Sequence, residues 1–125
     1  MVIERSIDIE DAVRLALSGH LTAYCRPLPK NYTLPCILVS KVGGSDRDKI
    51  DTHEVVLDAR ANTEYDADLT LRNAIGILKA AGDGTAIRYV QVTSSGSWGS
   101  DPVRPDLAMC SARLRITAHV ERATI

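Results

Sequence analysis

The chain has 125 residues, of which 45% are hydrophobic, so it can build one ordinary core, and we expect a single domain over residues 1–125. Its 15 Lys and Arg residues balance 16 Asp and Glu residues, and a net charge of −1 excludes a broad basic field for nucleic acid or an anionic membrane. The first twenty residues lack the basic and apolar regions of a signal peptide, and no later apolar stretch approaches membrane-spanning length. We therefore expect a protein made in a cytoplasm and without membrane contacts.

Cysteine and aromatic content constrain the core further. Cys25, Cys36 and Cys110 are odd in number and widely scattered, which predicts free, mostly buried thiols and argues against a disulfide framework. The chain has no Phe and one Trp. We therefore expect a core of Leu, Ile, Val and Ala, packed without large rings.

The first part of the chain predicts a helix followed by a connector. Residues 6–24 place apolar side chains at steps of three and four, the stripe of an amphipathic helix, with Ser6 or Asp8 as its N-cap. Gly19 weakens the last turn, so we expect the regular helix to loosen there. Residues 26–35 carry three prolines, which fix φ and remove backbone donors, and this predicts a connector.

Two strands are expected next, separated by a charged segment. Residues 36–42 form a short apolar run typical of a buried strand, and residues 52–61 alternate apolar and polar side chains as a second strand does. The segment between them, GGSDRDKID at 43–51, is too long for a two-residue turn and is rich in Gly and Asp. It predicts a hairpin with a long, solvated tip.

The remainder of the chain predicts another helix and another hairpin. Residues 63–66, TEYD, resemble a capping box, and apolar residues follow at helical spacing as far as Ala81. Residues 87–93 are rich in β-formers, residues 94–106 are rich in Ser, Gly and Pro, and residues 108–120 alternate like a one-sided strand. The order α-β-β-α-β-β predicts an α+β fold, with a four-stranded, mostly antiparallel sheet and both helices packed on one face.

No motif in the sequence assembles a catalytic or metal site. The carboxylates of Asp46-x-Asp48-x-x-Asp51 lack the spacing and flanking helices of an EF-hand loop, and the basic residues between them favour a solvated tip. The cysteines and histidines show neither CxxC nor HxxxH spacing. We expect His20 to be a partly buried core residue or to form a hydrogen bond at the helix end, and His53 and His119 to lie on strand surfaces. GSWGS at 96–100 is not followed by the helix that a nucleophile elbow requires. We expect no enzymatic activity, no cofactor and no metal.

The remaining candidates lie on the surface. Arg113, Arg115 and His119 fall on the outward face of the last strand, although a solvated sheet face also explains them. Trp98 lies between glycines in the expected second loop, and exposed aromatic residues at loop tips are enriched in protein interfaces. The same ring would also fit a fold in which the loop packs back on the core.

The order of these features resembles a known family. The first half of the chain combines an N-terminal helix containing AVRLAL at 12–17, a Pro-rich connector, the strand LPCILV at 34–39 and a charged hairpin tip. The second half combines a strand that leads into an Ala/Asp/Leu-rich helix with a last strand that alternates Arg with apolar residues. Over nearly its full length, the chain resembles the tail terminator (tail completion) proteins of long-tailed bacteriophages.

The resemblance implies a structural role in the neck or tail of a virion. Proteins of this family close the growing tail tube as a ring, commonly of six subunits, and offer a surface for head attachment. The implied partners are copies of the chain, the major tail (tube) protein and a head-completion or connector protein, with DNA passing through the lumen without specific binding. The implied ring or tube contacts lie mainly on the two tips, 43–51 and 95–106, and on the last strand: Asp46, Arg47, Asp48, Lys49, Trp98, Arg104, Arg113 and Arg115.

Two alternatives stay open at this point. A head-completion or neck protein of the same particle would stack on the portal side, and binding to filled heads instead of tail tubes would identify it. A small ligand-binding or enzymatic α+β domain would use the crevice between helix and sheet, near His20 or Cys36. Saturable binding of a small molecule, or a turnover that is lost on His20→Ala, would favour this second alternative.

Replacing Arg47 and Lys49 together with Glu is expected to leave the fold intact and to impair assembly, because charges at a contact tip set partner and register. Circular dichroism measures the fold, and particle titre measures assembly. Unchanged titres would count against the tip as a contact.

Overall fold

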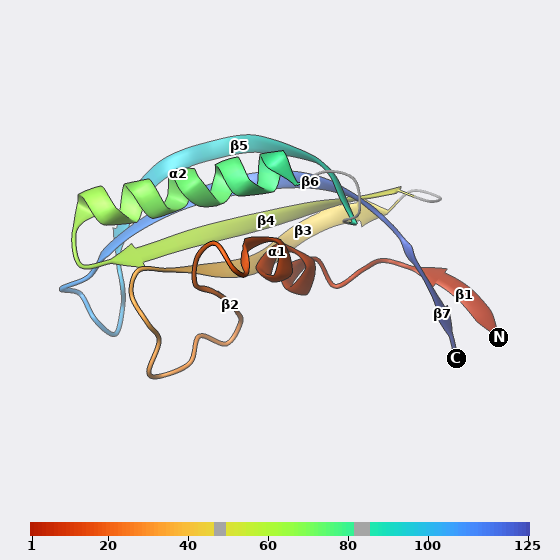
Figure 1. The fold of residues 1–125 in the computed structure, drawn as a ribbon, viewed down its shortest axis with the longest axis horizontal. Helices are drawn as coiled ribbons and strands as arrows, with labels where there is room; N and C mark the ends of the chain where they lie inside the picture. The colour runs from red at the N-terminus through yellow and green to blue at the C-terminus, as the bar shows by residue number, and fades with distance from the viewer. Residues whose placement is uncertain (47–49, 82–85) are drawn as a thin grey trace.

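The computed structural model describes residues 1–46, 50–81 and 86–125, without the Asp46 side chain. Within these residues the chain forms two helices and seven strands, and the strands divide into a five-stranded sheet and a separate two-stranded sheet (Figure 1). The α+β class agrees with the sequence, but the expected four-stranded sheet is wrong. None of the described helices is long and apolar enough to cross a membrane.

The larger sheet is mixed. In spatial order its strands are β2 (Ala23–Cys25), β3 (Cys36–Asp46), β4 (Ile50–Ala61), β6 (Ala108–His119) and β5 (Ile87–Ser100). The short strand β2 runs parallel to β3, whereas every other pair is antiparallel. Strand β2 was missed because Tyr24 continues the apolar stripe of the preceding helix, and a strand this short carries too few residues to show a period of two.

The smaller sheet pairs two short strands from opposite ends of the sequence. Strand β1 (Val2–Arg5) is antiparallel to β7 (Glu121–Thr124), and the two extend as a ribbon away from the helices (Figure 1). The pairing sets Arg5 opposite Glu121, and the guanidinium Nε lies 2.9 Å from the carboxylate. Neither strand alternates apolar and polar residues over a full strand length, so the sequence pattern did not reveal them.

Both helices pack on the same face of the larger sheet. Helix α1 (Ile9–Leu17) is capped by Asp8, whose side chain accepts a hydrogen bond from the amide of Asp11. Helix α2 (Glu64–Ala80) is capped by Thr63, whose hydroxyl accepts a hydrogen bond from the amide of Asp66. The first helix ends at Leu17, close to the expected weakening at Gly19, whose φ of +84° turns the chain immediately after the helix.

The core lies between the helices and the sheet and is aliphatic. The two helices and strands β3 to β6 contribute its buried apolar side chains, and the largest fully buried ones include those of Leu17, Ile37, Leu57, Leu78 and Leu114. The even–odd alternation of β4 and β6 agrees with the sequence, because directly opposed residues such as Leu57 and Ala112 share the helix-facing side. Among the described residues, no aromatic side chain is part of this core.

Both hairpin tips are shorter than expected. Strand β3 continues to Asp46 and β4 begins at Ile50, so most of the expected 43–51 tip is paired strand. Gly44 permits this continuation, since its φ is +149° and a Cβ there would lie 2.4 Å from the carbonyl oxygen of Thr52. Strand β5 likewise continues to Ser100, which leaves residues 101–107 as the connection to β6.

A buried ion pair fixes this connection to the sheet. The Arg60 Nε of β4 lies 2.8 Å from Asp101 Oδ2, and both side chains are less than one tenth exposed. The other oxygen of Asp101 accepts hydrogen bonds from the amides of Val103 and Arg104 at 2.8 and 3.1 Å. Burial alone would raise the pKa of Asp101, but these hydrogen bonds and the charge of Arg60 outweigh it and lower the pKa to about 2.

Replacing Asp101 with Asn is expected to lower the free energy of unfolding at pH 6 by about 3 kcal/mol, because it leaves the Arg60 charge buried and unpaired. The pKa of Asp101 is depressed in the folded state, so its contribution is complete above about pH 4 and is lost as the pH falls towards 2. The difference between wild type and variant should therefore shrink by roughly 2 kcal/mol from pH 6 to pH 2. Urea unfolding at several pH values measures both effects.

Asp106→Asn is the matched control, since Asp106 forms an exposed pair with Arg104 at 3.6 Å in the same connection. Its effect should stay within about 0.5 kcal/mol at every pH. A pH-independent difference for Asp101→Asn would contradict the assigned role of the carboxylate.

Candidate interaction surface

The face of the large sheet that points away from the helices carries a polar cluster. The strand registers place Glu54 of β4, Tyr89 and Gln91 of β5, and Arg113 and Arg115 of β6 on this side. Gln91 and Glu54 flank Arg115 on neighbouring strands, and Tyr89 lies opposite Thr117. We call these five residues the open sheet face.

Electrostatics make the open sheet face slightly basic. The guanidinium groups of Arg113 and Arg115 lie 3.8 and 3.4 Å from the two oxygens of Glu54. About half of each arginine side chain remains exposed. Two cations therefore share one carboxylate, and surface pairs of this kind contribute little to stability. Their arrangement suits recognition of an acidic or aromatic surface better than it suits holding the fold together.

The structure brings together some of the expected contact residues. Arg113 and Arg115 lie side by side on β6, as expected, whereas Trp98 lies opposite Cys110 and so belongs to the other face of the sheet. Trp98 is half exposed and lies within β5, so the expected loop position is wrong. Arg104 belongs to the 101–107 connection, where its guanidinium lies near Asp106.

The charged tip stays untested by the structure. Arg47, Asp48 and Lys49 lie outside the described residues. The backbone of Asp46 pairs with that of Asp51 at the end of the hairpin, but the Asp46 side chain is also outside the described part. The expectation that these four residues form a contact therefore stays a prediction.

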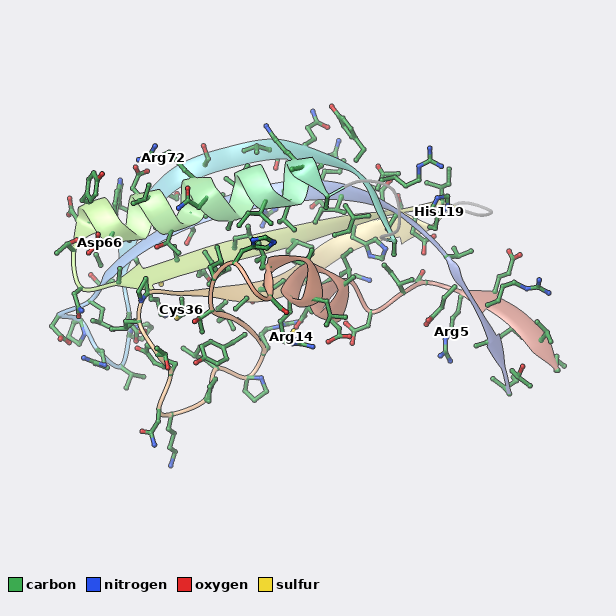
Figure 2. The ribbon with its side chains drawn as sticks, viewed as in Figure 1. Arg5, Arg14, Cys36, Asp66, Arg72 and His119 are labelled. Carbon is green, nitrogen blue, oxygen red and sulfur yellow. The ribbon has the colours of Figure 1, made fainter. Side chains whose placement is uncertain are left out.

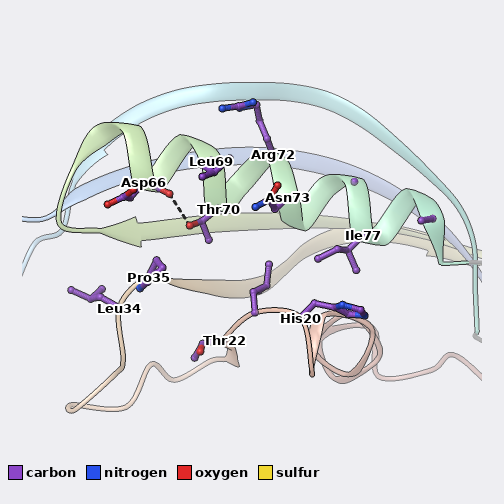
Figure 3. A pocket seen from close by; sticks show the side chains of 13 residues that line it. His20, Thr22, Leu34, Pro35, Asp66, Leu69, Thr70, Arg72, Asn73 and Ile77 are labelled. Atoms are coloured by element: carbon purple, nitrogen blue, oxygen red, sulfur yellow. Dashed lines mark hydrogen bonds between the residues drawn. The ribbon is translucent and has the colours of Figure 1, made fainter.

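A groove lies on the helix side of the molecule. It has a volume of about 960 Å³ and runs between α2 and the segments at residues 20–22 and 34–35 (Figure 3). Its lining mixes apolar side chains such as Leu69 and Ile77 with the polar groups of His20, Asp66 and Arg72. His20 is exposed at the rim, so the expectation of a partly buried core residue is wrong. The groove matches the expected crevice near His20, but Cys36 does not line it.

The cysteines and histidines do not form a reactive centre within the described residues. Cys36 and Cys110 are fully buried, and burial raises the pKa of the Cys36 thiol to about 11. His119 is exposed, with a ring nitrogen 3.2 Å from the Arg88 guanidinium (Figure 2). His53 was expected on the strand surface but is buried, as discussed below. No group of three or more metal-ligating side chains occurs in the described part of the chain.

Three residues of the open sheet face, Tyr89, Gln91 and Glu54, were missed from the sequence. Tyr89 and Gln91 alternate with the apolar Val90 and Val92, and this local pattern already indicates which side they take. Glu54 could not be assigned to the arginines because pairing Glu54 with Arg115 requires the register of β4 against β6. The chain matches no known protein-family model and no curated protein at a significant level of sequence similarity.

In the folded protein, Cys36 and Cys110 are expected to resist Ellman's reagent at pH 8, because buried thiols with raised pKa values supply little thiolate. Cys25 is partly exposed and should react first, although burial also raises its pKa. Thiol titration with and without urea measures this order. Rapid reaction of all three thiols without denaturant would contradict the buried positions.

Proposed function

We propose that the protein is a structural subunit of a bacteriophage virion that assembles into a ring and closes the tail tube as a tail terminator. The observation that carries the proposal is the distribution of aromatic side chains. The chain has four Tyr and one Trp, and Tyr65, Tyr89 and Trp98 are each more than half exposed. Aromatic side chains are enriched in the centres of protein interfaces, where they supply most of the binding energy.

The other two aromatic residues support the fold by their hydroxyl groups. Tyr24 accepts a hydrogen bond from the amide of Thr33, and Tyr32 donates one to Asp101. The core contains aliphatic side chains and no aromatic ring, so the three exposed rings are not the outer members of an aromatic cluster in the core. They instead lie at separate places: the first turn of α2, the open sheet face, and the far part of β5.

This separation supports a head-to-tail contact between copies. A surface that meets a different surface of the next copy is heterologous, and such contacts close into a ring when the rotation between copies allows it. In the two-layer fold, the open sheet face and the helix layer lie on opposite sides, so one copy can present the sheet to the helices of the next. The slightly basic open sheet face and the acidic first turn of α2, with Glu64 and Asp66, are compatible with this order.

The near-neutral charge of the chain is compatible with a ring through which DNA passes. A net charge of −1 supplies few contacts to phosphates, so DNA would cross the lumen without tight binding. The partners in this proposal are copies of the chain, the tail tube protein and a head-completion protein. Its location is the neck of the virion, after synthesis in the bacterial cytoplasm.

Light scattering at several protein concentrations and negative-stain electron microscopy test ring formation. We then expect rings at one end of tail tubes from the same phage, and tube growth should stop when the protein is added. Binding to filled heads but not to tubes would instead indicate a head-completion protein. A strictly monomeric protein that binds neither tubes nor heads would overturn the proposal.

Tyr89→Ser combined with Arg113→Glu should weaken ring formation at least tenfold, because it removes an aromatic anchor and reverses a charge on the open sheet face. The melting temperature should change little, since both side chains are about half or more exposed. Lys30→Glu, an exposed charge reversal in the connector, is the control and should assemble like wild type. Normal assembly of the double variant would exclude the open sheet face as a contact.

A further inference from the structure

Two ionisable residues on β4 are buried without complete hydrogen bonding. Asp51 and His53 are each 1% exposed and lie on the helix-facing side of the strand, beyond the apolar residues Val55 and Leu57. Asp51 Oδ2 accepts a hydrogen bond from the hydroxyl of Ser6. Among the described residues, Asp51 Oδ1 and both ring nitrogens of His53 have no partner. Buried polar atoms are normally paired, so these three atoms require an explanation.

A pocket is lined by both residues. It has a volume of about 240 Å³, and Asp51 and His53 line it together with hydroxyl and backbone groups. The remaining lining residues are Ser6, Lys41, Gly44, Ser45 and Thr52. A water molecule occupies about 30 Å³ in the liquid, so the pocket has room for a small polar group of several atoms.

The pocket lining carries one acidic and one basic side chain, and the two form no ion pair within the described residues. A buried carboxylate without a counter-charge is costly, and the described residues provide no ion pair to Asp51. Lys41 lines the pocket, but its ammonium forms no ion pair with any described carboxylate. Burial, together with the charge of Lys41, lowers the pKa of His53 and outweighs the opposite effect of Asp51. The ring is therefore neutral at physiological pH and offers one donor and one acceptor.

We propose that this pocket receives an alkylammonium or guanidinium group, which donates hydrogen bonds to Asp51 Oδ1 and to the acceptor nitrogen of His53. Such a group balances the buried carboxylate and satisfies atoms that the described chain leaves unpaired. Two sources carry this chemistry: a lysine or arginine side chain of a second copy, and a free small amine. The inference does not depend on the tail terminator role.

Other occupants fit the pocket less well. An anion would lie against the Asp51 carboxylate. A tightly bound metal ion would need more ligands than one carboxylate and one imidazole, and the described residues hold no group of three. Water alone would satisfy the hydrogen bonds but would leave the Asp51 carboxylate without an ion pair.

The test is a titration of the isotope-labelled full chain with methylguanidinium, followed by the NMR signals of the His53 ring and the Thr52 and His53 amides. We expect saturable shifts with a half-point in the millimolar range. Asp51→Asn should weaken binding at least tenfold, because it removes the charge and keeps the shape. Lys41→Met should strengthen binding several-fold, because it removes a like charge at the rim.

Tetramethylammonium, which has the charge but no N–H donors, and sodium chloride at equal concentration are the controls. If Asp51→Asn does not fold, the comparison of methylguanidinium with tetramethylammonium still decides the matter. Absence of a saturable shift in the wild type, equal binding by Asp51→Asn, or equal shifts with the control cations would each overturn the proposal.

Light scattering during the same titration identifies the source. If a second copy supplies the cation, methylguanidinium should dissociate the oligomer at constant ionic strength, and Asp51→Asn should be monomeric. If a free amine is the ligand, the shifts should appear while the mass stays constant. If the wild-type protein binds methylguanidinium but does not cap tail tubes, the proposed function is disproved and this inference stands.

Discussion

The alternation of side chains along β4 organises the whole molecule. Because successive residues point to opposite sides of a sheet, one parity of this strand fills the aliphatic core and the other forms the outer face. The same rule carries Asp51 and His53 into the helix-facing side, and Glu54, Asp58 and Arg60 to the opposite side. A slip of one residue against β6 would exchange these sets, so the core and both polar regions depend on a single register.

The buried carboxylates near the two ends of β4 have different hydrogen-bond partners. At one end, the Asp101 carboxylate receives a guanidinium and two backbone amides, and this set holds the 101–107 connection against the sheet. At the other end, Asp51 receives a single hydroxyl and lies beside a neutral imidazole. A largely satisfied network of buried hydrogen bonds rigidifies a fold, whereas an unsatisfied network leaves donors and acceptors to which a further group can bind. We infer that the first end serves stability and the second serves recognition.

Strong local periodicity made part of the fold predictable. The alternation of residues 108–120, the capping residue Thr63 and the apolar stripe of α2 each specified an element without any distant partner. Elements defined by partners escaped prediction. Strand β2 is defined by its hydrogen-bond pairing with β3, and strand β1 by its pairing with β7. Short strands of this kind have no intrinsic signal that separates them from connectors.

The candidate sites follow the same division. Arg113 and Arg115 were found because a strand puts alternate residues on one face, but their carboxylate partner Glu54 depends on tertiary register. His53 lies within the expected strand 52–61 and is expected on its surface. In the structure β4 begins earlier, at Ile50, and the core side extends to the polar end of the strand. His53 occupies the same alternate positions as Val55 and Leu57, so the alternation of the expected strand already indicates the buried side.

An aliphatic core with a single, half-exposed indole also has a spectroscopic consequence. Trp98 is the sole tryptophan of the chain, and it lies towards the end of β5 with about half its surface in solvent. Fluorescence excited at the red edge of the tryptophan absorption band therefore arises from one surface position. Its emission wavelength and its quenching by iodide report what covers β5 near Trp98 and carry no signal from the interior. The molecule thus contains its own optical probe of docking, with no label required.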